Sequence, residues 1–235
     1  MRGMIRPTLR LAALVVASLS TLSTAAVAAD APAVQLFNGK DLSGWSHYLV
    51  DPKVAMADVW SVRDGVLVCK GEPLGYLYTN AEYTSFKLVV EWRWAPGAAA
   101  KLGKTPNSGV LMRVTPGPKG VPQAYEAQLQ AGSAGDIYGF WGLPLNGDGT
   151  RRRDAKGHEL LGDMVGFKKA QAAEKAEGEW NRYEITFDGP NLTVVVNGIQ
   201  VNSGVDAKVT PGRIALQSEG GEIHFRKVEL VPLGK

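Results

Sequence analysis

The chain consists of short segments in which apolar and polar residues alternate, and this period of two constrains its fold most strongly. The segment 86–94 shows it best, because every second side chain, from Phe86 to Trp94, is apolar. Successive side chains of a strand point to opposite faces, so the pattern predicts strands with one buried face. Similar segments occur at 60–62, 66–68, 110–114, 125–130, 183–187, 192–196, 199–201, 213–217 and 222–230.

Turn residues separate these segments. Asp64-Gly65 and Asn197-Gly198 favour tight hairpins, because both residues of each pair adopt positive φ with little strain. Sustained helical periodicity is nearly absent. Short strands at regular spacing with such turns predict an all-β fold, an antiparallel two-sheet sandwich of the jelly-roll type.

The first 28 residues have the pattern of a secretory signal peptide. Arg2, Arg6 and Arg10 precede a short apolar run at 11–22, and Ala26-Val27-Ala28 matches the small-residue cleavage pattern. The run is about half a membrane span, which is too short for an anchor. We therefore expect a secreted or periplasmic protein whose mature chain, residues 29–235, forms a single domain.

The charge balance gives no reason to expect nucleic acid or an anionic membrane as a partner. The precursor carries 26 basic and 23 acidic residues, and the signal peptide removes three arginines and no acid, so the mature chain has no formal net charge. Cys69 is the single cysteine and lies in an apolar run, which predicts a buried structural thiol. The sequence does not indicate an oligomeric state.

One stretch, 140–179, departs from the strand pattern. It is rich in Gly, Lys and Arg, and only residues 168–177 have the composition of a short helix. We expect a long loop insert there that lies across one end or face of the sandwich, because a loop of this length in a compact domain is usually functional or disordered.

Most motifs of known catalytic chemistry are absent, including the nucleophile elbow, the P-loop and the metalloprotease helix motif. His47, His158 and His224 are far apart in the sequence, so a histidine metal site is not indicated. No cofactor is identified, although Glu, Asp and His on one sheet face could bind a divalent metal ion. Any catalysis must therefore use carboxylates, amides, arginines or tyrosines.

Strand alternation gives the first candidate site. Within 125–130, Glu126 and Gln128 fall on the face opposite Tyr125 and Leu129, which must pack on the core. A row of carboxylate and amide groups suits the hydroxyls of a sugar. If the strands are neighbours, we expect convergence on one concave sheet face of Glu126, Gln128, Arg113, Glu91 and Arg93. The alternative is an ordinary solvated face, as most antiparallel sheets have.

The six tryptophans divide into two groups. Trp92 and Trp94 fall on the apolar face of their strand and are expected in the core. Trp45, Trp141 and Trp180 lie in or beside loops, where an indole could stack on a sugar ring or could instead close the end of the sandwich.

Several ordered motifs resemble the 3-keto-disaccharide hydrolase domain family. The resemblance covers residues 35–233 and rests on the following blocks: LFNGKDLSGW (36–45), NSGVLMR (107–113), YEAQLQ (125–130), GDIYG (135–139), EWNRYEI (179–185), VNGIQV (196–201) and GRIALQSEGGEIHFRKVEL (212–230). The chain departs from the family at 225–227, which reads FRK where members often have FRN, and at the poorly matched insert 140–179.

The resemblance implies a concanavalin-like jelly roll that cleaves the bond at C1 of a sugar oxidised at C3. A ketone at C3 acidifies the proton on C2, so a base can remove it and the C1 substituent can leave; water addition then completes a net hydrolysis. This chemistry needs a base near C2, a donor or cation near the C3 oxygen and an acid near the leaving oxygen. Similar folds that hydrolyse ordinary glycosides often place carboxylates as ExDxE, which this chain lacks.

Strand parity and the resemblance together suggest roles. Glu126 would be the acid or base, Arg113 would stabilise the oxyanion, and His224 is a further catalytic candidate. The substrate-binding candidates are Gln128, Glu91, Arg93, Asp136, Tyr138 and Trp141.

Two other functions fit the same sequence. A carbohydrate-binding module would bind sugar without turnover and would tolerate Glu126→Gln. A structural or interaction domain of the periplasm would expose a large apolar patch in place of a polar cleft. The sequence leaves open the exact sugar, the anomer, the aglycone, and whether the lyase or the hydratase half-reaction is catalysed.

Overall fold

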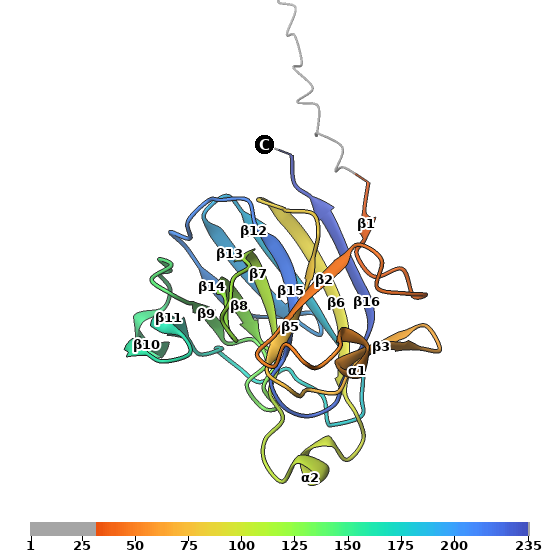
Figure 1. Ribbon diagram of the computed structural model, residues 1–235. Helices are drawn as coiled ribbons and strands as arrows, with labels where there is room; N and C mark the ends of the chain where they lie inside the picture. Colours follow the sequence, from red (N-terminus) through yellow and green to blue (C-terminus); the bar gives the residue numbers. More distant parts are fainter. Residues whose placement is uncertain (1–31, 235) are drawn as a thin grey trace, which may run out of the picture.

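The computed structural model describes residues 32–234, so the predicted signal peptide lies outside the described residues. Two antiparallel sheets pack face to face (Figure 1). The first contains, in spatial order, β14 (Ile199–Gly204), β13 (Asn191–Val196), β12 (Asn181–Asp188), β6 (Phe86–Trp94), β16 (Ile223–Pro232), β4 (Val66–Cys69) and β3 (Trp60–Arg63), and β1 (Val34–Gln35) pairs with β16. The predicted jelly-roll sandwich is therefore confirmed.

The second sheet carries the candidate site. It consists, in spatial order, of β10 (Arg152–His158), β11 (Gly162–Phe167), β9 (Ile137–Gly139), β8 (Gln123–Gln128), β7 (Gly109–Thr115), β15 (Arg213–Ser218), β5 (Gly75–Thr79) and β2 (Trp45–Leu49). Three short helical segments complete the described chain: α1 (Met56–Val59), α2 (Ala98–Leu102) and the 3-10 turn η1 (Gly149–Arg151). None of the helices within residues 32–234 is long and apolar enough to cross a membrane.

One hydrophobic core fills the space between the sheets. Phe86, Leu88, Val90 and Trp92 of β6 are fully buried, as their alternation predicts, and Trp94 is buried beside them. Full burial of each such side chain contributes roughly 1.5–3 kcal/mol to folding. Cys69 is also buried in this core, and burial raises the pKa of its thiol to about 11, so it is an inert packing residue.

The two predicted hairpins occur where the turn dipeptides lie. Asp64-Gly65 joins β3 to β4, and Asn197-Gly198 joins β13 to β14; all four residues have positive φ. This is the left-handed geometry that a two-residue turn needs to follow the twist of its strands.

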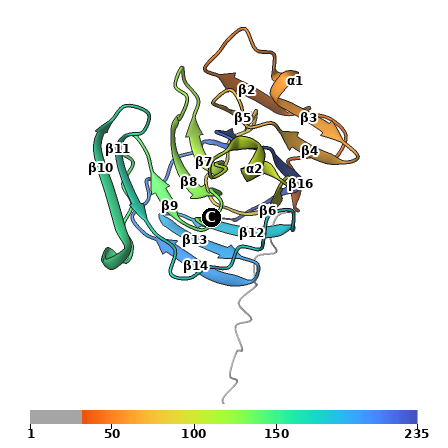
Figure 2. The same cartoon turned by 90° about the horizontal axis from the view of Figure 1, so that it is seen from below.

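The stretch 140–179 differs from the expected loop insert. It contains η1 and the hairpin β10–β11, which pairs with β9 and extends the second sheet at one edge (Figure 2). Residues 168–177 are not helical. The composition concealed the hairpin because most side chains of β10 are charged and exposed, so the strand shows no apolar alternation.

Candidate active site

A cavity of about 350 Å³ lies on the outer face of the second sheet, the face turned away from the core. Its volume falls within the range of small-ligand sites, about 300–1,000 Å³. Phe140, Leu161 and Met164 form an apolar wall. The polar lining consists of Asn107, Glu126, Gln128, Tyr138, Arg153, Lys168, Gln217 and Glu219.

Strand alternation explains why polar side chains form the floor of the cavity. On β8, Tyr125 and Ala127 enter the core while Glu126 and Gln128 face the cavity. Tyr138 of β9 lies opposite Glu126 in the strand register, and Gln217 extends the polar row on β15. The sheet therefore brings side chains from three separate parts of the sequence onto one face.

Gly109 of β7 makes room for the two acceptor groups at the floor. A Cβ atom on Gly109 would lie 2.0 Å from Glu126 Oε1 and 2.8 Å from Gln217 Oε1. Both oxygens therefore crowd over a backbone position that has no side chain, which is one reason for glycine in a strand interior.

We predict that Gly109→Ala disrupts the cavity more than the fold. The added methyl must displace the Glu126 carboxyl, so kcat/KM should fall by about tenfold or more, while overpacking costs roughly 1–3 kcal/mol of stability. Steady-state kinetics and thermal unfolding would check this. Gly117→Ala is the matched control, because a Cβ there meets no atom within 4 Å. An unchanged kcat/KM in Gly109→Ala would mean that the reacting groups do not lie in this cavity.

Glu126 is a buried acid whose carboxyl group has no hydrogen-bond partner among the described residues. Its side chain is 2% exposed. Burial, and secondarily the charges of Glu219 and Asp136, raises its pKa well above the usual range. Burial therefore favours the protonated form of the Glu126 carboxyl, the form that can donate a proton.

Glu219 is the second acid of the cavity. Burial raises its pKa to about 7, while a hydrogen bond from Asn107 and the charge of Lys104 act in the opposite direction. Two carboxyls in one pocket, each with its pKa raised by its surroundings, are a common arrangement for one acid and one base.

Tyr138 and Asp136 form an adjoining pair. Burial raises the pKa of Tyr138 strongly, so its hydroxyl keeps its proton and donates. That hydroxyl is 3.5 Å from Asp136 Oδ2, the outer limit of a hydrogen bond, and can turn to a ligand. Asp136 is 5% exposed, and its other oxygen accepts a hydrogen bond of 2.8 Å from the backbone N–H of Lys169.

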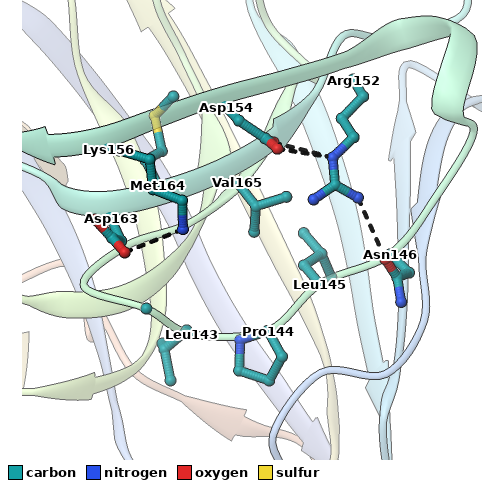
Figure 3. A pocket seen from close by; sticks show the side chains of 11 residues that line it. Leu143, Pro144, Leu145, Asn146, Arg152, Asp154, Lys156, Asp163, Met164 and Val165 are labelled. Carbon is teal, nitrogen blue, oxygen red and sulfur yellow. Dashed lines mark hydrogen bonds and ion pairs between the residues drawn. The ribbon is translucent and has the colours of Figure 1, made fainter.

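Two cations, Arg153 and Lys168, stand exposed at the cavity mouth. No salt bridge joins either of them to a carboxylate within residues 32–234. The opposite face of the same hairpin differs: there a cavity of about 250 Å³ has its charges paired internally, Arg152 with Asp154 and Lys156 with Asp163 (Figure 3). The uncompensated charges of β10–β11 thus face the site.

The structure does not place Arg113 in the cavity, and the expected convergence is wrong for this residue. A β-bulge interrupts the β7–β8 register between Met112 and Thr115, and Arg113 has φ 50°. The extra residue reverses the alternation, so the guanidinium turns inward and lies 4.0 Å from the centre of the Phe187 ring. There it donates to the carbonyls of Thr84, Lys208 and Gly189 at 2.6–3.1 Å.

Glu91, Arg93 and His224 are also elsewhere. They lie on β6 and β16 of the first sheet, on its outer face, so the core separates them from the cavity. Glu91 is paired with Arg182 at 3.0 Å and Arg226 at 2.6 Å. His224 bonds to Arg93 at 3.3 Å and Glu222 at 2.8 Å. Parity predicted the outward orientation of Glu91 and Arg93 but could not say which sheet they belong to.

Trp141 lies beside the site and not in its lining. Its indole N–H donates to the carbonyl of Val121 at 2.9 Å, and its ring covers Gly162. The side chain therefore fixes the hairpin β10–β11 against the sheet.

The sequence did not predict five of the polar residues that line the cavity: Asn107, Arg153, Lys168, Gln217 and Glu219. The alternation of β15 carried a usable signal for Gln217, because Ile214 and Leu216 enter the core and Ala215 and Gln217 must face outward. The sequence offered no comparable signal for Arg153 or Lys168.

Within residues 32–234, no group of three or more His, Cys, Asp or Glu side chains is arranged to hold an ion.

Comparison with protein families gives a match that covers most of the chain. The model of the 3-keto-alpha-glucoside-1,2-lyase-like domain matches residues 32–231. A search of curated proteins found no match.

Solved structures show the same fold in carbohydrate-related proteins. A proposed glycosyl hydrolase from Parabacteroides distasonis ATCC 8503 has a TM-score of 0.59 at 22% identity, covering 86% of this chain and 94% of that one. The carbohydrate-binding module CBM66 from Bacillus subtilis has 0.55 at 12% identity, covering 79% and 94%. The endo-β-1,3(4)-glucanase SCLam of family GH16 has 0.52 at 14% identity, covering 85% and 89%. At these identities the likeness concerns the fold alone.

Proposed function

The chain belongs to the 3-keto-alpha-glucoside-1,2-lyase-like domain family, and on that premise we propose that it cleaves the glycosidic bond of 3-keto-glycosides by elimination. One observation supports this most strongly: two carboxyl groups, those of buried Glu126 and partly buried Glu219, share a cavity, and burial raises the pKa of both. Such a pair can supply both the base and the acid that the elimination requires.

The first step is removal of the C2 proton. Glu219, which is ionised in a large fraction of molecules at neutral pH, takes this proton, and the electron pair moves to the C3 oxygen as an enolate. Donors on the cavity wall stabilise the negative charge: the hydroxyl of Tyr138 and the cations Arg153 and Lys168. These cations take the role that the sequence analysis gave to Arg113.

The second step is departure of the C1 substituent. The enolate re-forms the ketone, the C1–O bond breaks, and protonated Glu126 gives its proton to the leaving oxygen. The product is a 3-keto sugar with a double bond between C1 and C2. The two carboxyls have now exchanged states, so ionised Glu126 can take a proton from water that adds at C1 while Glu219 returns its proton to C2. The sum is hydrolysis.

The assay that tests this proposal offers the mature protein a 3-keto-glucoside with a chromogenic leaving group and, separately, the unoxidised parent glucoside. We expect release from the keto substrate alone. Parallel reactions with a chelator test metal dependence. Saturable sugar binding with release from neither substrate would refute the enzyme and favour a carbohydrate-binding module.

The two carboxyls also predict a bell-shaped pH profile. kcat/KM should rise with pH through about 7 as Glu219 loses its proton, because only its ionised form is a base. It should fall again at higher pH as Glu126 loses the proton that the leaving group needs. Glu219→Gln should remove the rising limb together with most activity. A profile flat from pH 5 to 9 would contradict the assignment.

A further inference from the structure

Two side-chain oxygens of the cavity are buried without a hydrogen bond. Among residues 32–234, the buried side-chain atoms that lack a partner are three tryptophan N–H groups and two oxygens, Asn107 Oδ1 and Gln217 Oε1. Both of these residues line the cavity beside Glu126 and Glu219. Leaving a buried acceptor unpaired is costly, so such atoms in a pocket indicate donors supplied by a ligand.

The surroundings fix the direction in which the Asn107 oxygen points. The amide NH2 of Asn107 donates to the carboxyl of Glu219, so its oxygen is turned away from that group. A flipped amide would place two oxygens against each other. Gln217 is 2% exposed, and its Oε1 lies over the backbone of Gly109, at the floor of the cavity.

The other side of the cavity offers donors. Gln128 Oε1 accepts hydrogen bonds of 2.8 Å from the backbone N–H groups of Leu129 and Gln130, so its NH2 group is the part left for a ligand. Tyr138, Arg153 and Lys168 lie on this same side, on or beside β9 and the hairpin β10–β11. The lining is thus divided into an acceptor side around β15 and a donor side around β8, β9 and β10.

We propose that this division orients the sugar ring: two of its hydroxyl groups donate to Gln217 Oε1 and Asn107 Oδ1, and its keto oxygen faces the donor side. The identity of the ring rests on the proposed function. A ketone oxygen carries no proton and cannot donate to an acceptor, so the reverse orientation, with the keto oxygen on the acceptor side, leaves at least one of the two acceptors unpaired. The site therefore selects rings that keep two free hydroxyl donors and discriminates against deoxygenated or O-alkylated ones.

The test measures binding without turnover. The probe is a C-glycoside of 3-keto-glucose, which has no leaving oxygen, together with its 2-, 4- and 6-deoxy derivatives, titrated calorimetrically into the mature protein. For wild type we expect two deoxy derivatives to bind about tenfold to a hundredfold more weakly, because each leaves one acceptor unpaired. Gln217→Met should remove the penalty for one of them, and Asn107→Leu for the other.

Gln200→Met is the matched control, because Gln200 is an exposed residue of β14 in the first sheet. It should keep the wild-type pattern. Equal affinities across the deoxy series in wild type, or no saturable binding, would overturn the proposal; the first outcome would leave protonated Glu126 as the partner of Gln217. Turnover of the matching O-glycoside is measured separately, so a clear binding pattern without turnover would refute the proposed function alone.

Discussion

Replacing Glu126 with glutamine is expected to lower kcat on a 3-keto-glucoside by about 10²–10⁴-fold, the usual contribution of a positioned acid or base. The amide is nearly isosteric and fits the same buried position, but it cannot give a proton to the leaving oxygen. KM should change much less, because the other polar groups of the lining remain. The measurement is steady-state kinetics near pH 7 with the chromogenic keto substrate.

Glu91→Gln is the matched comparison that shows which of the two sheets carries the reacting residues. Glu91 was a candidate from strand parity, yet it lies on the outer face of the first sheet in ion pairs with Arg182 and Arg226. We expect its kcat to stay within about twofold of wild type, because the core separates Glu91 from the cavity. Wild-type kcat in Glu126→Gln, or a large loss of kcat in Glu91→Gln, would contradict the assignment of the reaction to the cavity on the second sheet.

The same Glu126 substitution should stabilise the protein above pH 5. A carboxyl whose folded pKa lies above its unfolded value of 4.5 binds more protons in the folded state, so stability declines as pH rises from 4.5 toward the folded pKa. The decline is about 1.4 kcal/mol per pH unit for a single group. Glutamine does not titrate, so the Tm of the mutant should fall less steeply with rising pH than the Tm of the wild type. A gain in stability with a loss of turnover is the signature of a functional residue.

Arg113→Met should unfold the protein far more readily without changing the chemistry. The substitution leaves three carbonyls in partly buried hydrogen bonds, those of Thr84, Lys208 and Gly189, without their donor. We expect a loss of about 3–5 kcal/mol in unfolding free energy, which corresponds to a Tm lower by roughly 10 °C. Denaturant unfolding and calorimetry would measure it.

Enzyme kinetics of Arg113→Met, measured at temperatures below its unfolding transition, separate this structural role from the role of oxyanion stabiliser that the sequence suggested. KM and kcat of the folded fraction should remain near wild type, because the guanidinium lies against Phe187 on the core side of the sheet. Arg226→Met is the matched control: this arginine is exposed, and its loss should cost less than about 1 kcal/mol. A stable Arg113→Met protein with abolished kcat would restore the original assignment.

Local alternation determined most of the architecture. The period of two in segments such as Phe86–Trp94 follows from backbone geometry alone, and the turn dipeptides Asp64-Gly65 and Asn197-Gly198 fix where strands reverse. The same rule correctly turned Glu126 and Gln128 away from the core. Each of these features depends on neighbours within a few residues, so it can be read from the sequence.

The tertiary structure decided which outward-facing residues meet. Glu91 and Glu126 both point outward, but β6 and β8 belong to different sheets, and strand partners are chosen by packing between distant segments. The bulge at Arg113 reversed one alternation that the sequence could not flag, and a charged hairpin from a supposed loop supplied Arg153. The pKa values of Glu126 and Glu219 likewise arise from burial by side chains remote in sequence. The sequence by itself therefore determined most of the strands and their faces, whereas the site exists only where long-range packing joins them.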